Sequence, residues 1–335
     1  MGRPGPGLLA LVTANAVTGH TIGLLHRWNA SGVELSDEWK QVACAAVLGV
    51  RHAAQRNGAV VAALSSIPAG HNFSSVSFDT GSAAQLGLAA WREALAAGSQ
   101  FVVGASLSTV STPLALNGAV DRMPQISYWS SAVALSDKTL YPYFARTFPT
   151  DAYAGELLIQ VLDSVGGRWA NVPIIHVNYE YAATYVHVMR SAATRSKHIQ
   201  IPVVFSFNYG DAAGVEAAVA RLAASKYNII FSLVSHHDLE AMMRAADQHG
   251  LLSDSYVWLT ADTLNEMSPL ATSDPTFVGA AMHGMLQLEA TGADNPGYER
   301  LRGVFASLAP ADCNDGRFQM PASLFQQGLG TNAHS

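Results

Sequence analysis

Charged residues are scarce in this chain, and the basic ones never cluster. Lys, Arg, Asp and Glu make up 13% of the 335 residues, and the formal net charge is −6. The scattered Lys and Arg form no stripe that could follow a phosphate backbone. We therefore expect no nucleic-acid partner.

Long apolar runs are missing as well. A membrane-spanning helix needs about 20 consecutive apolar residues, and no stretch approaches that length. We expect contact with a membrane only through segments outside this chain. Near the N-terminus, Arg3 and residues 8–12 precede Ala14-Asn15-Ala16, a pattern similar to a secretory signal, although a disordered start explains the same residues. Sequons at Asn29 and Asn72 fit a secreted product.

Cysteine is nearly absent. Cys44 and Cys313 are the only two, too few for a disulfide framework or a zinc knuckle. Cys44 lies in an Ala/Val-rich helical pattern, where we expect a buried, inert thiol. Cys313 lies in a polar tail.

The common catalytic motifs are missing too. The chain has no Gly-x-Ser-x-Gly, P-loop, Gly-x-Gly-x-x-Gly or His-Glu-x-x-His motif. His236-His237-Asp238 has no second ligand cluster at zinc spacing, so it predicts a solvated loop. We expect no cofactor and no metal.

One catalytic pattern is present only in part. Asp79-Thr80-Gly81-Ser82 matches the run of aspartic proteases. That chemistry needs two carboxylates sharing a proton, and the chain has no second Asp-Thr/Ser-Gly run. A capped helix start is the preferred interpretation, and an aspartic protease is the remote alternative.

Short β-branched runs alternate with Ala-rich amphipathic segments, which predicts an α/β fold with parallel sheets. The expected strands cover residues 21–25, 60–64, 101–103, 126–127, 172–177, 203–207, 229–234, 256–259 and 279–289. The expected helices cover residues 36–58, 83–97, 113–123, 153–165, 182–196, 215–224 and 239–249, with Pro113 opening the third.

The pattern restarts after Pro149, which predicts two lobes. We expect a first lobe over residues 18–150, a second over 151–289, and a partly irregular tail over 290–335 that returns toward the first lobe. Ligands of open α/β sheets sit beyond the carboxyl ends of the strands. The cleft between the lobes is therefore the expected site.

Two hydroxyl-rich turns follow strands of the first lobe. One contains Ser108 and Thr109, and the other contains Ser130 and Ser131. Hydroxyls and free amides at a helix N-terminus suit a carboxylate. On its own, the first turn favours ordinary helix capping by Ser111 or Thr112.

Acidic and aromatic residues occupy comparable positions in the second lobe. Asp151 follows the crossover between the lobes, Tyr181 follows one strand, and Asp262 follows another. A carboxylate at a strand end can pair with an ammonium. Helix capping is the alternative for both acids, and Tyr179 competes with Tyr181.

The run from Pro124 to Asp137, with Phe148-Pro149-Thr150-Asp151 after it, resembles the bilobed Venus flytrap region of periplasmic amino-acid-binding proteins and class C G-protein-coupled receptors. The glutamate-receptor branch has a similar Tyr-x-Ser/Ala-Ser/Thr-x-x-x-Leu-Ser-Asp run. The match implies two Rossmann-like lobes of the type I periplasmic-binding-protein fold, joined at a hinge.

The same resemblance implies a receptor rather than an enzyme, placed outside the cell or in the periplasm. Its lobes would close on a small amino-acid-like ligand, and it could form a homodimer through the first lobe. The ligand carboxylate would bind Ser108, Ser131 and their neighbours Thr109 and Ser130. The amine would bind Asp151, Tyr181 and Asp262.

Several positions depart from the family pattern. Gln41 stands where glutamate-selective members keep an arginine. The ligand could therefore be a neutral amino acid or an amine as readily as glutamate. Ala182 and Tyr185 replace glycines of the family. A soluble substrate-binding protein of an ABC amino-acid transporter shares the fold and is the alternative function.

Overall fold

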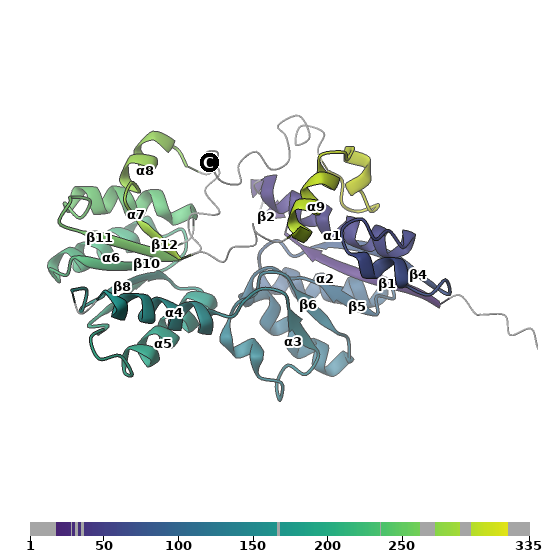
Figure 1. The fold of residues 1–335 in the computed structure, drawn as a ribbon, viewed down its shortest axis with the longest axis horizontal. Coiled ribbons are helices and arrows are strands. Elements are labelled where there is room, and N and C mark those ends of the chain that lie inside the picture. The colour runs from purple at the N-terminus through teal and green to yellow at the C-terminus, as the bar shows by residue number, and fades with distance from the viewer. Residues whose placement is uncertain are drawn as a thin grey trace, which may run out of the picture.

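The computed structural model describes residues 18–27, 29–30, 33–34, 37–165, 168–234, 236–261, 272–288 and 296–320. They form two lobes side by side, each built on a five-stranded parallel sheet flanked by helices (Figure 1). The predicted α/β fold with two lobes is confirmed.

The first lobe holds a sheet of order β4-β1-β5-β6-β7. Its strands are β1 (Thr18–His26), β4 (His71–Asp79), β5 (Phe101–Val103), β6 (Gln125–Ser127) and β7 (Phe144–Arg146). Its helices are α1 (Asp37–Gln55), α2 (Ala84–Ala96) and α3 (Ser108–Asp121). Short elements are the antiparallel pair β2 (Asn29–Ala30) and β3 (Val33–Glu34), and the 3-10 helices η1 (Ala62–Ser66) and η2 (Val133–Ser136).

Neighbouring residues of β1 show how both faces of this sheet are covered. Leu24 packs in the cluster that includes α1, and Leu25 packs in the cluster that includes α2 and α3. Successive side chains of a strand point to opposite faces, so helices must cover both.

The second lobe repeats this design with a sheet of order β12-β11-β10-β8-β9. Its strands are β8 (Ile174–Val177), β9 (Val204–Phe207), β10 (Ile229–Leu233), β11 (Val257–Ala261) and β12 (Leu286–Leu288). Its helices are α4 (Asp151–Ser164), α5 (Glu180–Ala193), α6 (Ala212–Ala224), α7 (His236–Gln248) and α8 (Pro275–Ala281).

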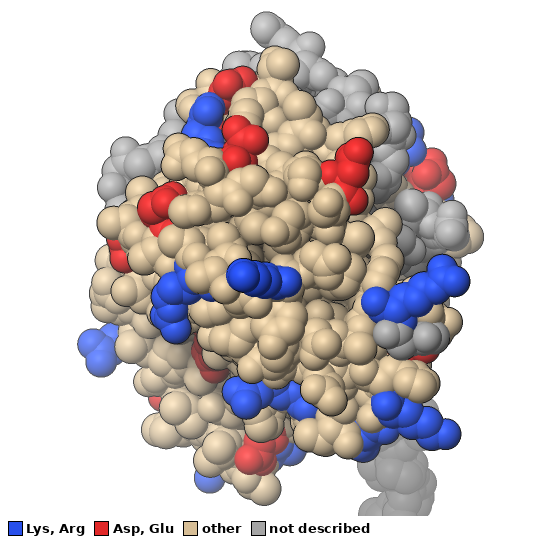
Figure 2. Space-filling model, turned by 90° about the vertical axis from the view of Figure 1, so that its left-hand side faces the viewer, with Lys and Arg blue, Asp and Glu red and all other residues tan. Residues whose placement is uncertain are grey.

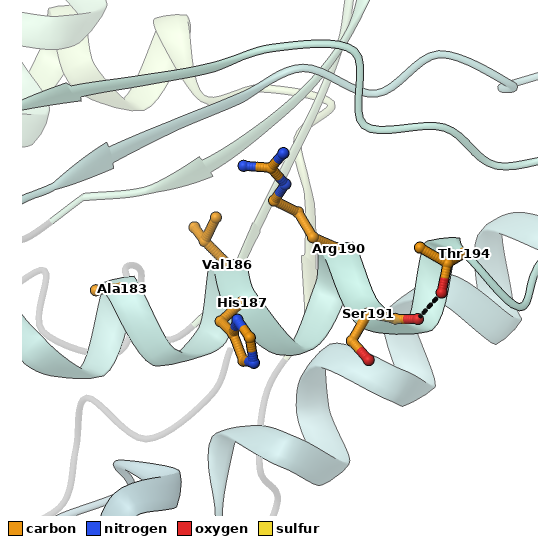
Figure 3. A pocket seen from close by; sticks show the side chains of 6 residues that line it. All are labelled: Ala183, Val186, His187, Arg190, Ser191 and Thr194. Atoms are coloured by element: carbon orange, nitrogen blue, oxygen red, sulfur yellow. Dashed lines mark hydrogen bonds between the residues drawn. The ribbon is translucent and has the colours of Figure 1, made fainter.

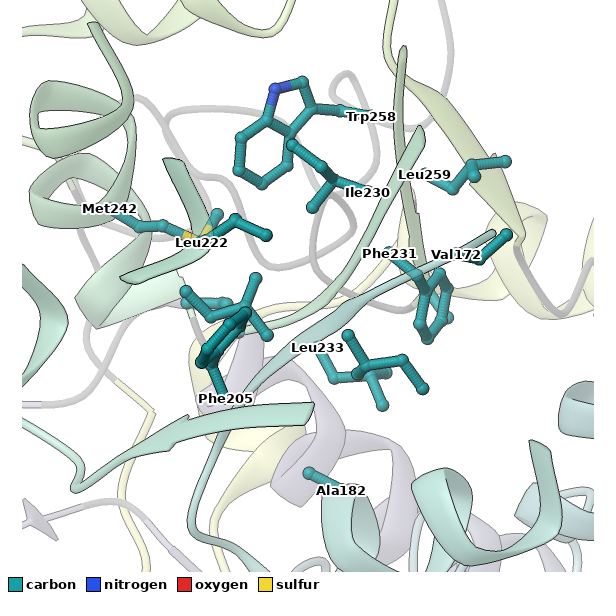
Figure 4. Close-up of a cluster of buried hydrophobic side chains, with 14 of the residues drawn as sticks. Val172, Ala182, Phe205, Leu222, Ile230, Phe231, Leu233, Met242, Trp258 and Leu259 are labelled. Carbon is teal, nitrogen blue, oxygen red and sulfur yellow. The ribbon is translucent and has the colours of Figure 1, made fainter. Parts of the chain in front are cut away.

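The core of the second lobe surrounds the central strands. Every residue of β8 and β10 is buried, as expected for parallel strands covered on both faces. Phe231 of β10 lies in this cluster with Trp258 and Leu259 of β11 (Figure 4). Tyr185 of α5 stacks on Phe231 with the ring centroids 5.7 Å apart.

The C-terminal segment packs on the first lobe. Helix α9 (Pro296–Phe305) lies beside α1 (Figure 1), and η3 (Pro310–Cys313) contacts α1. Cys313 forms a disulfide with Cys44, so the expectation of a free, inert thiol is wrong. The guanidinium of Arg51 donates to the carbonyls of Asp312 and Asn314, both at 2.5 Å.

Several sequence predictions of single elements are also wrong. Residues 60–64 form no strand, because this exposed apolar run enters the 3-10 helix η1 and the strand follows at His71. Residues 279–289 divide between α8 and β12. Strand β12 pairs with β11 and thus belongs to the second sheet.

Helix α3 begins five residues before Pro113, which lies inside it. Pro113 is the sixth residue of α3, so the helix lacks the N–H bond that this position would make to the carbonyl of Thr109, four residues back. The expectation that Pro113 opens the helix is wrong. His237 likewise belongs to the first turn of α7 and not to a loop.

The Asp79-Thr80-Gly81-Ser82 run forms a turn and not a capped helix start. Gly81 and Ser82 adopt positive φ angles of 52° and 59°. The Thr80 hydroxyl donates to the His26 carbonyl at 3.0 Å, and α2 starts two residues after Ser82 without a side-chain cap.

Removing the disulfide tests the docking of the C-terminal segment. We expect the double variant Cys44→Ala and Cys313→Ala to lose about 2–5 kcal/mol of unfolding free energy, because the crosslink closes a loop of 269 residues. Urea unfolding of the oxidised and variant proteins measures the difference. Two titratable thiols in the unreduced wild type would contradict the bond.

Candidate functional site

The first turn of the candidate site connects β5 to α3. Gly104 holds a φ of +115°, and a Cβ atom there would lie 2.0 Å from the Leu25 carbonyl oxygen, so only glycine fits. The turn delivers Ser108 and Thr109 to the first turn of α3, where backbone amides have no helical acceptor.

A serine network joins this turn to the one that follows β6. The carbonyl oxygen of Ala105 accepts from the hydroxyls of Ser111 at 3.0 Å, Ser127 at 2.6 Å and Ser130 at 3.3 Å. The Ser130 hydroxyl also lies within hydrogen-bond distance of the Ser106 carbonyl at 3.0 Å and of the Ser111 hydroxyl at 2.8 Å, so these acceptors share its one proton. The sequence predicted that Ser130 binds ligand, but its hydroxyl donates to acceptors within the protein.

The other predicted hydroxyls keep a donor available. The Ser108 hydroxyl accepts from the Ala132 amide at 3.1 Å, and its own proton has no acceptor among the described residues. The Thr109 and Ser131 hydroxyls make no hydrogen bond within the described part of the chain. Ser108 and Ser131 are buried and Thr109 is half-buried. The bond from Ala132 places Ser108 beside the turn that carries Ser131.

Arg146 of β7 binds the backbone of the turn that follows β6. Its guanidinium donates to the carbonyls of Ser130 at 3.1 Å and Ala132 at 2.8 Å, and also to the Ser136 hydroxyl. Burial lowers the pKa of Arg146, while the charge of Asp151 acts in the opposite direction. Arg146 is a positioning residue that sequence reasoning missed.

Helix α4 begins directly after the crossover between the lobes, and its N-cap residue is Thr150. The Thr150 hydroxyl accepts from the Ala152 amide at 3.0 Å, so Thr150 is the N-cap. Asp151 is the first helical residue and is 3% exposed. Its amide donates to the Ser131 carbonyl at 3.0 Å, and its carboxylate accepts from Thr184 at 3.1 Å. A backbone hydrogen bond thus joins Asp151 and Ser131, two residues that the sequence predicted for the site.

The remaining predicted residues lie on the second lobe. Tyr181 is half-buried in the first turn of α5, and its ring centroid is 6.4 Å from that of Tyr179. Strand β11 ends at Ala261, and Asp262 lies outside the described residues.

One contact between the lobes was not anticipated. The Thr112 hydroxyl of α3 donates to both carboxyl oxygens of Glu180 on α5, at 3.0 and 3.1 Å. Burial raises the pKa of Glu180, and the bond from Thr112 opposes that shift. The charge of Glu180 adds to the burial that raises the pKa of Tyr141.

A second cluster that the sequence did not predict joins the end of β1 to the turn after β6. The His26 ring nitrogen Nδ1 lies 3.4 Å from the Tyr128 hydroxyl. Burial lowers the pKa of His26 to about 3, so its ring is neutral near pH 7. Burial raises the pKa of Tyr128 to about 12, against the opposing charge of Arg27.

A surface cavity lies apart from these residues. Its volume is about 420 Å³, and its walls come from α5 (Figure 3): Ala183, Val186, His187, Arg190, Ser191 and Thr194. It contains none of the predicted ligand-binding residues. The face of the second lobe in Figure 2 shows acidic and basic residues spread across wide uncharged areas.

Two absences concern the described ranges alone. No helix in them combines the length and apolar character that crossing a membrane requires. No group of three His, Cys, Asp or Glu residues in them could hold a metal ion.

The two parallel sheets and their flanking helices define a bilobed α/β protein. A sequence model described as the receptor family ligand binding region matches residues 55–330, and the chain belongs to this family. This confirms the resemblance to a class C Venus flytrap domain with the type I periplasmic-binding-protein fold.

Individual relatives agree with that assignment. The chain is 27% identical over 182 residues to metabotropic glutamate receptor 6 of Rattus norvegicus, covering 53% of this chain and 21% of the relative. It is 35% identical over 78 residues to metabotropic glutamate receptor 8 of Homo sapiens, covering 23% and 9%. The chain thus spans about a fifth or less of the curated relatives it matches.

Adjacent serines allow a test of the division between structural and available hydroxyls. We expect Ser130→Ala to lower the unfolding free energy by about 1–2 kcal/mol, because buried acceptors lose their donor. Ser131→Ala should change it by less than about 0.5 kcal/mol. Urea unfolding checks both, and equal effects would contradict the division.

The raised pKa of Glu180 predicts a pH dependence. For an acid whose folded-state pKa is raised, the stabilising contribution is complete below the ordinary value of 4.5 and is lost as the pH rises through the folded-state pKa. Wild type should therefore lose stability relative to Glu180→Gln over that rise. Thr112→Val, which removes the opposing bond, should move the transition to higher pH. Parallel stability curves would refute the assignment.

Proposed function

We propose that this chain is the extracellular ligand-binding region of a receptor that closes its two lobes around a small amino-acid-like ligand. One observation carries the proposal: Ser108, Thr109 and Ser131 lie near the N-terminus of α3, and their hydroxyls donate to no acceptor among the described residues. Membership of the receptor ligand-binding family supports it. The proposal contains no catalytic step.

The ligand carboxylate would bind at the N-terminus of α3. The helix end attracts negative charge through its free amides. Ser108, Thr109 and Ser131 would add hydroxyl donors, and Ser130 would position the turn through its bonds to Ala105 and Ser106. The serine network fixes these donors before a ligand arrives, so little ordering accompanies binding.

The ligand ammonium would bind on the second lobe. Asp151 lies one backbone hydrogen bond from Ser131, which suits a ligand whose ammonium and carboxylate share one carbon. Tyr181 would cover the ammonium with its ring. Asp262, which follows β11, would supply a second carboxylate.

Closure would follow from contacts on both sides of the ligand. Binding shifts the lobes toward the closed state only by its higher affinity for that state. We assign residues 18–150 and 151–289 to the lobes and 290–335 to the returning tail. The proposal includes a homodimer through the first lobe, with membrane contact through segments outside this chain.

A thermal-shift screen against the common amino acids tests this function. A ligand at 100 times its Kd should stabilise the protein by about 2.7 kcal/mol. Ser131→Ala and Asp262→Ala should abolish the shift while the unliganded melting temperature stays nearly unchanged. Ser164→Ala, at the exposed end of α4, is the matched control and should bind normally.

The negative outcomes are equally specific. Failure of every amino acid and simple amine to shift the melting temperature would overturn the proposal. A large loss of unliganded stability in Asp262→Ala would show that this acid is structural.

A further inference from the structure

A row of aromatic rings extends beyond the proposed ammonium site. Tyr181 lies 6.4 Å from Tyr179, whose ring stacks on Tyr209 with the centroids 5.3 Å apart. Tyr209 in turn lies 4.8 Å from the ring of His237. The row starts at the residue proposed to cover the ammonium and leads away from it.

The row stands at the ligand-binding edge of the second sheet. Tyr179 follows β8, Tyr209 follows β9 and His237 follows β10, three neighbouring strands of the sheet. Their carboxyl ends share one edge, where ligands of parallel α/β sheets bind. Glu180, between two of the tyrosines, contacts Thr112 of the first lobe.

Hydrogen bonds hold the three loops in register. The Asn178 side-chain amide donates to the side-chain oxygen Oδ1 of Asn208 at 2.9 Å. The buried carboxylate of Asp238 accepts from the Gly210 amide, also at 2.9 Å, which ties the loop of Tyr209 to the start of α7. The row is thus fixed in place, yet Tyr209 remains 47% exposed.

The formal charges within the three loops that carry the row are all negative. Residues 178–181, 208–211 and 236–238 include Glu180, Asp211 and Asp238, but no lysine or arginine. Asp211 caps α6 and Asp238 holds Gly210, so both acids are fixed. Stacked tyrosine faces beside carboxylates attract cations. An acidic side chain would meet repulsion here.

We propose that the aromatic row is a specificity subsite for a basic side chain, so that the ligand is a cationic amino acid. This inference rests on the proposed function, which places the ligand's ammonium beside Tyr181. The planar guanidinium suits the row better than a compact ammonium, because it stacks on aromatic faces. L-arginine is accordingly the best probe.

The test compares L-arginine with L-citrulline, which has nearly the same shape and no side-chain charge. Calorimetric titration of the full chain should give a Kd at least tenfold lower for arginine. L-glutamate, L-leucine and L-phenylalanine should bind more weakly than arginine. Similar affinities for arginine and citrulline, or tighter binding of an acidic or apolar amino acid, would overturn the inference.

Variants of Tyr209 locate the effect on the row. Tyr209→Ala should weaken arginine binding about tenfold, the size of one cation–π contact, and leave citrulline nearly unaffected. Tyr209→Phe keeps the π face and should retain binding. Tyr153→Ala, which removes a 76% exposed tyrosine of α4 outside the row, is the matched control. Equal losses for both ligands in Tyr209→Ala would contradict a charge-selective role.

The outcomes separate this inference from the proposed function. Binding of some amino acid that requires Ser131, without preference for arginine, would remove the subsite and leave the function. Absence of binding by all amino acids would remove both.

Discussion

The carbonyl oxygen of Ala105 is the acceptor on which the candidate site depends. Three serine hydroxyls converge on it from α3, β6 and the turn after β6. A buried carbonyl needs hydrogen-bond partners, and the serines supply them while locking two turns together. These serines satisfy the backbone, and the neighbouring hydroxyls at Ser108, Thr109 and Ser131 are the ones that we propose bind the ligand. In this proposal an inner layer of serines fixes the geometry and an outer layer binds.

The turn that carries Ser130 and Ser131 also contacts the second lobe. The Ser131 carbonyl accepts from the Asp151 amide, and Arg146 binds the carbonyls on either side of Ser131. A ligand at Ser131 would therefore bear directly on the first residue of α4. Glu180 gives the lobes a second contact through Thr112. The first connection joins two backbone groups, and the second involves the ionisable side chain of Glu180.

Much of the architecture could be predicted because parallel strands and amphipathic helices have distinct local patterns. The failures came where local pattern is ambiguous. Residues 60–64 look like a strand, but the apolar run is exposed and no sheet position receives it. Pro113 looks like a helix start, and only packing decides that α3 begins earlier. Within the site, residue types identified the turns. They could not show that the Ser130 hydroxyl is hydrogen-bonded within the protein, whereas the Ser131 hydroxyl has no such bond among the described residues.

The sequence alone determined the fold class, the general alternation of strands and helices, and the two hydroxyl-rich turns, because these follow from periodicity and residue chemistry along short segments. Tertiary structure decided which residues far apart in the chain meet. It paired Cys44 with Cys313, brought Thr112 to Glu180, and aligned Tyr179, Tyr209 and His237. Such contacts depend on how the sheets and helices pack in three dimensions, which no local pattern encodes.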